Sequence, residues 1–191
     1  MKQRTIYFFR HGATGGNLEK RYIGRTDEAL LPESVELIQR KVFPKTDVIF
    51  TSPLKRCIQT TEIAYPGKPY LVVEDLRECD FGEFEGRNYF ELSQNPDYQK
   101  WIDSNGVMPF PQGETPALFK QRSIQAFLTC AEQLKEDASA TFIVHNGTIM
   151  SVFEALAKEK KTYYEWSVDH VCGYSCVFDH ICLKHISRLE L

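Results

Sequence analysis

Basic side chains follow three apolar segments of this sequence, close to the point where each segment ends. They are Arg10 and His11 after 6–9, Arg56 shortly after 47–51, and His145 directly after 141–144. If these segments are parallel strands, their carboxyl ends lie along one edge of a sheet, where α/β proteins bind their ligands. We therefore expect two arginines and two histidines that are far apart in the sequence to converge in space.

This set of side chains is suited to an anion. Guanidinium groups bind phosphate oxygens in a bidentate manner. Helices expected to begin near residues 53 and 148 would direct backbone N–H groups to the same place. Three glycines after His11 would let the backbone approach a bound group closely: Gly12, Gly15 and Gly16. The pattern predicts a site for phosphate or for a phosphoryl group.

Histidine adds chemistry to such a site. A neutral imidazole can attack phosphorus and hold the phosphoryl group covalently, while surrounding cations stabilise the charge of the transition state. The leaving alkoxide also needs a proton. Glu78 follows the apolar segment 70–74, and a crowded site would raise the pKa of its carboxyl enough for general acid catalysis. Asp80 and Glu83 are the alternative candidates for this role.

Short apolar strands alternate with amphipathic helices, which predicts an α/β fold with a mostly parallel sheet. The strands are expected at 4–9, 47–51, 70–74, 141–144, 174–178 and 181–186, and the helices at 34–42, 53–64, 88–94, 116–135 and 148–158. Ser52-Pro53 and Thr115-Pro116 resemble helix starts, and Thr148 is a further candidate cap. The glycine- and proline-containing segment 76–113 is expected to be irregular or cap-like.

The composition fits an ordinary globular protein. The 191 residues are 42% hydrophobic and 26% charged, which suits one domain over 1–191. A net charge of −3 argues against nucleic-acid binding through bulk charge. No apolar run is long enough to span a membrane, and the N-terminus lacks the pattern of a signal peptide. Six cysteines in such a chain are expected to be reduced thiols of a cytoplasmic protein.

Four motifs occur in an order typical of one known family. They are RHGATGGN (10–17), SPLKRCIQT (52–60), LRECDFGEFEG (76–86) and VHNGT (144–148). Together they resemble the histidine phosphatase, or phosphoglycerate mutase-like, superfamily. The resemblance implies a three-layer α/β/α sandwich with a small cap, here 76–113, and a reaction without a metal or cofactor. Within the family, the third motif is most similar to α-ribazole phosphatases and broad-specificity phosphatases.

The resemblance also implies roles for individual residues. His11 would be phosphorylated, Arg10, Arg56 and His145 would hold the phosphoryl group, and Asn17 would assist. Glu78 would donate the proton and then activate water. Substrate contacts would come from Thr14, Ile23 and Gly24. The family usually has glycine directly after its second histidine, whereas this chain has Asn146 and then Gly147, which would add a polar side chain to the pocket rim.

The sequence therefore predicts a phosphomonoesterase for a small phosphorylated metabolite, with α-ribazole phosphate as one candidate. A phosphoglycerate mutase and a non-catalytic module that binds phosphorylated ligands are the alternatives. Neither the substrate nor a homodimer can be read from the residues.

Two clusters have open interpretations. Histidines and cysteines near the C-terminus could bind zinc, or the cysteines could be small core residues: His170, Cys172, Cys176, His180, Cys182 and His185. Aromatic residues between 81 and 110 could form the core of the cap or line a pocket for the leaving group: Phe81, Phe84, Tyr89, Phe90, Tyr98, Trp101 and Phe110.

Overall fold

A six-stranded sheet runs through the protein, whose computed structural model describes residues 3–190. Its strands are β1 (Arg4–Arg10), β2 (Val48–Thr51), β3 (Leu71–Val72), β4 (Ser139–Val144), β5 (Gly173–Phe178) and β6 (Leu183–Leu189). The spatial order is β3-β2-β4-β1-β5-β6. The first four of these are parallel, whereas β5 pairs antiparallel with β1, and β6 antiparallel with β5.

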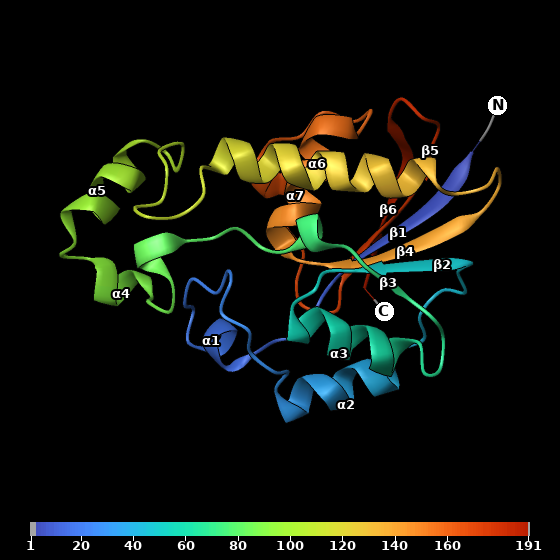
Figure 1. The fold of residues 1–191 in the computed structure, drawn as a ribbon, viewed down its shortest axis with the longest axis horizontal. Helices are drawn as coiled ribbons and strands as arrows, with labels where there is room; N and C mark the ends of the chain where they lie inside the picture. Colours follow the sequence, from blue (N-terminus) through green and yellow to red (C-terminus); the bar gives the residue numbers. More distant parts are fainter. Residues whose placement is uncertain (1–2, 191) are drawn as a thin grey trace.

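Helices cover both faces of the sheet (Figure 1). The helices are α1 (Gly15–Leu18), α2 (Pro32–Arg40), α3 (Lys55–Ala64), α4 (Tyr89–Leu92), α5 (Pro96–Asp103), α6 (Pro116–Glu132) and α7 (Asn146–Leu156). Helices α6 and α7 lie on one face, and α2 and α3 on the other. The predicted mostly parallel α/β/α sandwich is confirmed.

Strand β1 shows why the sheet needs both helical layers. Phe8 and Phe9 are neighbours, so their side chains point to opposite faces, yet both are fully buried. Phe8 packs into the cluster with Phe127 and Phe153 from α6 and α7, whereas Phe9 packs beside Cys57 of α3. A continuous apolar run of this kind is typical of a strand that is covered on both sides.

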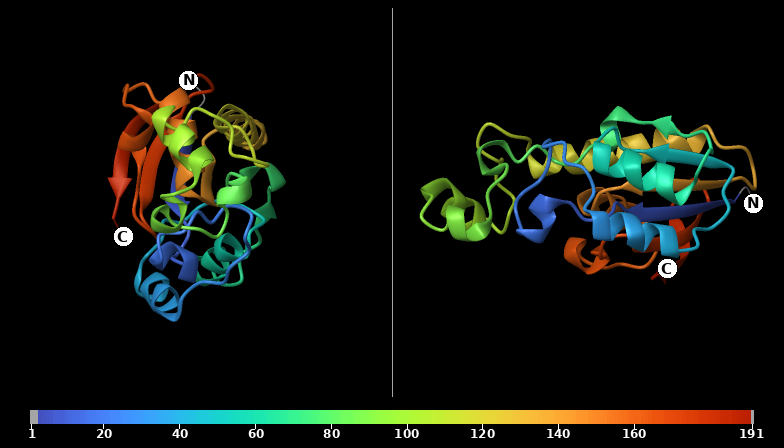
Figure 2. Two further views of the ribbon diagram at one scale, coloured as in Figure 1. Left: turned by 90° about the vertical axis from the view of Figure 1, so that its left-hand side faces the viewer. Right: turned by 90° about the horizontal axis from the view of Figure 1, so that it is seen from below.

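The segment 76–113 extends from one end of the sheet and carries α4 and α5, away from the two helical layers (Figures 1 and 2). It is less irregular than expected, because α5 forms within it. Asn95 accepts hydrogen bonds from the N–H groups of Asp97 and Tyr98, and Pro96 occupies the first helical position. The Asn95-Pro96 pair was therefore a helix signal that the sequence analysis did not use. The positions 1, 2 and 191 of the predicted domain lie outside the described residues.

Four helices begin at other residues than predicted. Helix α2 begins at Pro32 rather than 34, and α4 at Tyr89 rather than 88. Helix α3 begins at Lys55 rather than 53, because the hydroxyl of Ser52 is hydrogen-bonded to His145 instead of serving mainly as a cap. Helix α7 begins at Asn146 rather than 148, so Thr148 lies inside the helix and is not its cap. By contrast, Thr115 caps α6 as predicted, with its hydroxyl accepting a hydrogen bond from the N–H of Leu118.

Within residues 3–190, none of the helices combines the length and the apolar character that crossing a membrane requires. All six cysteines are free thiols, as predicted.

Candidate active site

The pairing of β1 with β4 brings the two predicted histidines together. Arg10 is in register with Val144, and the N–H of His11 donates to the carbonyl of Val144 at 3.0 Å. The residues that follow these strand ends, His11 and His145, are therefore neighbours. Their ring centroids are 5.0 Å apart, and the rings are inclined at 66°. Both side chains are buried.

The surroundings of His11 fix its protonation. Its Nδ1 lies 2.7 Å from the carbonyl oxygen of Gly12, and because a carbonyl only accepts, Nδ1 carries the hydrogen. Burial, followed by the charge of Arg56, lowers the pKa of His11 well below its usual value. The ring is therefore neutral near pH 7, and its Nε2 has a free lone pair.

Arg56 is held by the loop that follows α1. Its two terminal nitrogens donate to the carbonyls of Thr26 (2.8 Å), Gly24 (2.8 Å) and Ile23 (3.3 Å). The loop reaches this position because residue 24 is glycine: a Cβ there would lie 1.9 Å from the carbonyl oxygen of Cys79. In this structure Ile23 and Gly24 thus contribute backbone carbonyls that orient Arg56, a role that the sequence analysis did not foresee.

The two arginines leave unpaired donors beside His11. Arg10 is held through one terminal nitrogen, which donates to the carbonyl of Val168 at 2.9 Å. The Nε atoms of both Arg10 and Arg56 are buried without a hydrogen-bond partner among the described residues. The charges of Arg56 and Arg10 both act on His11 and lower its pKa. Because buried N–H groups are rarely left unpaired, these two donors are candidates to bind an anionic group.

His145 lies against α3. Its Nε2 is hydrogen-bonded to the hydroxyl of Ser52 at 2.8 Å and lies 3.6 Å from the Sγ of Cys57. Burial, and then the charge of Arg56, lowers the pKa of His145 well below its usual value, while burial raises the pKa of the Cys57 thiol to about 12. The site therefore contains two neutral imidazoles, whose pKa values are both lowered by the charges of Arg56 and Arg10.

Glu78 is the carboxylic acid of this site. Burial raises the pKa of Glu78, although the N–H of Cys79 and the charges of Arg56 and Arg10 oppose that change. Its Oε1 accepts from the N–H of Cys79 at 2.9 Å. A Cβ at residue 147 would lie 2.7 Å from the same oxygen, so Gly147 makes room for the carboxyl beside the first turn of α7.

The alternative acids have other surroundings. Asp80 accepts a hydrogen bond from the N–H of Gly82 and forms an exposed ion pair with Arg25. Glu83 is exposed to solvent. The structure thus brings Glu78, rather than these two residues, near the arginines.

Asn17 and Thr14 form a small unit at α1. The side-chain oxygen of Asn17 accepts from both the N–H and the hydroxyl of Thr14, each at 3.1 Å, which leaves the Asn17 amide nitrogen as a donor. The glycines after His11 were predicted to let the backbone approach a bound group, but the structure differs at two of them. The N–H of Gly12 donates to Thr60 and that of Gly16 to Glu28, so these two groups are already occupied.

Asn146 is engaged within the protein. Its amide nitrogen donates to the hydroxyl of Ser167 at 2.9 Å, and its oxygen accepts from the N–H of Val168 at 3.0 Å. Since the carbonyl of Val168 accepts from Arg10, Asn146 helps to fix the segment that holds this arginine. Asn146 is the first residue of α7 and does not form a left-handed turn. A contact between Asn146 and substrate remains a prediction.

His170 is a neighbour of His11 that the sequence analysis did not assign to the site. Its ring centroid lies 5.4 Å from that of His11, and its Nδ1 donates to the carbonyl of His11 at 2.9 Å. Burial, and then the charge of Arg10, lowers the pKa of His170 to about 4. His170 precedes the antiparallel strand β5, so it is the beginning of this strand that reaches the edge where the parallel strands end.

The other histidines and cysteines near the C-terminus are dispersed. Cys176 is a buried core residue, and His180 contacts the guanidinium group of Arg4 at the opposite end of β1 from His11. In the described part of the chain, no group of three or more histidines, cysteines or acidic residues is arranged to hold a metal ion.

A pocket of about 550 Å³ opens beside Glu78, Asn146 and Gly147. Aromatic rings form much of its lining: Tyr22, Phe81, Trp101, Phe110, Phe119, Tyr163 and Tyr164. The aromatic cluster is divided between a core and the pocket lining, and a leaving group in this pocket remains a prediction. Phe84 and Tyr98 are buried in a core of their own, Phe81 and Trp101 line the pocket, and Phe90 is exposed.

Comparison with known proteins identifies the family. The model of the histidine phosphatase superfamily (branch 1) matches residues 6–182. A putative phosphoserine phosphatase 2 from Hydrogenobacter thermophilus is 27% identical over 159 residues, which are 78% of this chain and 76% of that protein.

Two crystal structures have the same fold. A phosphoglycerate mutase from Thermus thermophilus is 27% identical with a TM-score of 0.75, over 98% of this chain and 99% of that one. A putative α-ribazole-5′-P phosphatase from Escherichia coli has a TM-score of 0.87 at 20% identity, over 97% and 95% of the two chains. The chain therefore belongs to the histidine phosphatase superfamily, and its enzyme class is that of a phosphatase.

Proposed function

We propose that this protein is a phosphomonoesterase that works through a phosphohistidine at His11 and needs no metal ion. The observation that carries the proposal is the pair of unpaired, buried Nε–H groups of Arg10 and Arg56 beside a neutral His11. A phosphoryl group would accept from both donors, and its phosphorus would lie in reach of the free Nε2 lone pair.

The reaction consists of two displacements at phosphorus. In the first, the Nε2 lone pair of His11 forms an N–P bond while the ester P–O bond breaks, and Glu78 gives its proton to the leaving alkoxide. In the second, Glu78 takes a proton from water, the water oxygen bonds to phosphorus, and the N–P electron pair returns to His11. Arg10, Arg56 and His145 stabilise the phosphoryl oxygens in both steps. Asn17 supplies a further donor through its amide nitrogen.

The two guanidinium groups already provide positive charge where phosphoryl-transfer enzymes of other kinds place metal ions. Hydrolysis of p-nitrophenyl phosphate is therefore expected to be unchanged in excess EDTA. The measurement is initial rate with and without chelator, beside elemental analysis of protein purified without a histidine tag. Activity that is lost to EDTA and restored by a divalent metal would contradict the mechanism, and stoichiometric zinc would revive the zinc hypothesis.

We further propose that the alcohol part of the substrate is large and apolar or aromatic, with segment 76–113 as its cap. The pocket beside Glu78 supports this proposal, since it is where the leaving group of a phosphoryl ester at His11 would lie. Of the described residues that line it, Lys120 alone is basic, and its Nζ is paired with Glu154 at 2.6 Å. α-Ribazole phosphate, an aromatic nucleotide, belongs to this class of substrate.

Two phosphate esters can test whether the pocket selects an aromatic alcohol. 2-Phenylethyl phosphate and O-phosphoserine are both phosphates of primary alcohols, but one carries an aromatic ring and the other a charged amino acid. Because burying a ring contributes about 1.5–3 kcal/mol, we expect kcat/KM to be roughly 10- to 100-fold higher for the phenylethyl ester. Phe81→Ala should reduce this preference, whereas Phe90→Ala, which removes an exposed ring of the same segment, should not. Equal rates for the two esters in the wild type would refute an aromatic leaving-group pocket.

The phosphoglycerate mutase of similar fold suggests a second candidate function. A mutase must hold a carboxylate together with a phosphate, and in this pocket the single lysine is already paired with a carboxylate. We therefore favour hydrolysis over transfer to a second alcohol. Conversion of 3-phosphoglycerate to its 2-isomer in the presence of 2,3-bisphosphoglycerate would reverse this preference.

A further inference from the structure

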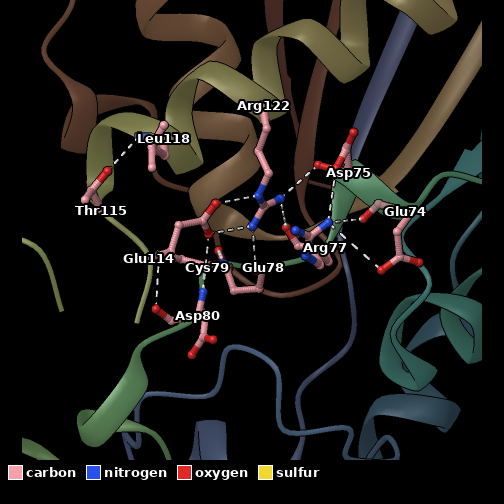
Figure 3. A network of polar contacts seen from close by, with 10 residues as sticks. All are labelled: Glu74, Asp75, Arg77, Glu78, Cys79, Asp80, Glu114, Thr115, Leu118 and Arg122. Atoms are coloured by element: carbon pink, nitrogen blue, oxygen red, sulfur yellow. Dashed lines mark hydrogen bonds and ion pairs between the residues drawn. The ribbon is translucent and has the colours of Figure 1, made fainter. Parts of the chain in front are cut away.

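Arg122, on α6, uses every N–H group of its guanidinium on two partners: one carboxylate and one loop. Figure 3 shows this side chain reaching from the helix to the segment that carries Glu78. The Nε–H donates to Glu114 at 2.7 Å, and one Nη2 hydrogen to the other oxygen of that carboxylate at 2.8 Å. The three remaining hydrogens go to the backbone carbonyls of Asp75 (2.9 Å), Arg77 (2.8 Å) and Glu78 (2.9 Å).

The loop has little regular structure to hold it. This stretch, residues 75–81, begins within the short 3₁₀ helix Glu74–Leu76 and ends before the short 3₁₀ helix Gly82–Phe84. Three of its carbonyls are instead fixed by the one guanidinium, which defines the path of the backbone on both sides of the Glu78 side chain. A planar fork of five donors is suited to this task, whereas a lysine ammonium has three donors and no fixed plane.

Glu114 extends the same contact to the far end of segment 76–113. Its N–H donates to the carbonyl of Asp80 at 2.9 Å, so the chain that leaves this segment lies beside the chain that enters it. The Arg122–Glu114 ion pair is shielded from water, with side-chain exposures of 13% and 15%. Helix α6, the Glu78 loop and the exit from the segment are thus joined at one guanidinium.

We propose that Arg122, oriented by Glu114, is a positioning residue that places the carboxyl of Glu78 for proton transfer to the leaving group. The inference rests on the proposed function, because it presupposes that Glu78 is the general acid. Arg122 itself contacts the loop backbone, Glu114 and the ring of Phe119, whose centroid lies 5.0 Å from the guanidinium carbon. It does not line the pocket, so it acts through Glu78 and not on the substrate.

A pair of substrates can isolate this role. p-Nitrophenolate leaves readily without a proton, whereas the alkoxide from p-nitrobenzyl phosphate requires one, and the two aromatic groups are similar in size. Loss of acid positioning should therefore lower kcat/KM for the benzyl ester far more than for the phenyl ester. The quantity to compare is the kcat/KM for the benzyl ester divided by the kcat/KM for the phenyl ester. For Arg122→Lys and Glu114→Gln we expect this ratio to fall by about 10- to 100-fold, as for other small misplacements of catalytic groups.

The ratio is informative even if a variant is unstable. Removing a partner of a buried ion pair destabilises folding, but both substrates are assayed on one preparation, so the folded fraction cancels. Arg21→Lys is the matched control, because Arg21 forms a similar two-pronged pair with Glu91 but no contact with the Glu78 loop. Its ratio should equal that of the wild type.

Glu78→Gln separates the positioning role of Arg122 from the proton transfer by Glu78. A fall in the ratio for Glu78→Gln and Arg122→Lys, but not for Arg21→Lys, supports the positioning role. A fall for Glu78→Gln alone overturns the role of Arg122 and leaves the proposed function intact. An unchanged ratio in Glu78→Gln removes the general acid itself, and the positioning role with it.

Discussion

Replacing His11 by Asn is expected to lower kcat/KM for p-nitrophenyl phosphate by about 10⁴-fold or more. The expectation follows from the loss of the Nε2 nucleophile, and removing the nucleophile of a serine protease costs at least this much. The measurement is the initial rate at mildly acidic pH, together with thermal unfolding to show that the variant is folded.

The same substitution elsewhere provides the control. His185 is an exposed histidine on β6, and His185→Asn should leave the rate unchanged. The intermediate can be sought directly in Glu78→Gln, where the slowed attack of water should let an acid-labile phosphoryl group accumulate on His11. Substantial turnover by His11→Asn, or a phosphoryl group found on another residue, would refute the phosphohistidine mechanism.

The central elements could be predicted because local sequence decides them. A strand that is covered on both faces must be apolar throughout, and β1, β2 and β4 show this pattern. Strand β3 was predicted over 70–74 but covers only Leu71–Val72, since it lies at the edge of the sheet and half of each side chain is exposed. Helix starts were less predictable where a side chain such as Ser52 has a tertiary partner that competes with capping.

The convergence of Arg10, His11, Arg56 and His145 could be predicted because it depends only on parallel strands ending at one edge. His170 could not be found in this way, since it precedes an antiparallel strand and approaches the edge from the other direction. Arg122 was equally hidden. Its partners lie in a loop without periodicity, and nothing in the helix around it distinguishes an arginine that holds three carbonyls from one that faces solvent.

The pH dependence of Glu78→Gln is the second test with a large expected effect. The first displacement needs a neutral His11 and a protonated Glu78. Burial lowers the pKa of His11 well below its usual value and raises that of Glu78 above its own, so both groups stay in the required form at mildly acidic pH. For an alkyl phosphate, kcat/KM should therefore be highest there and decline as Glu78 loses its proton at higher pH.

Glutamine cannot donate a proton, so Glu78→Gln should lower kcat/KM for an alkyl phosphate by about 10²- to 10⁴-fold and remove that decline. Ionisation of the substrate phosphate affects wild type and variant alike, which leaves the difference between their profiles to Glu78. Asp80→Asn changes the other nearby candidate acid, whose carboxylate binds the N–H of Gly82, and should leave the profile unchanged. If the decline persists in Glu78→Gln but disappears in Asp80→Asn, the proton comes from Asp80, and the raised pKa of Glu78 reflects only its burial beside α7.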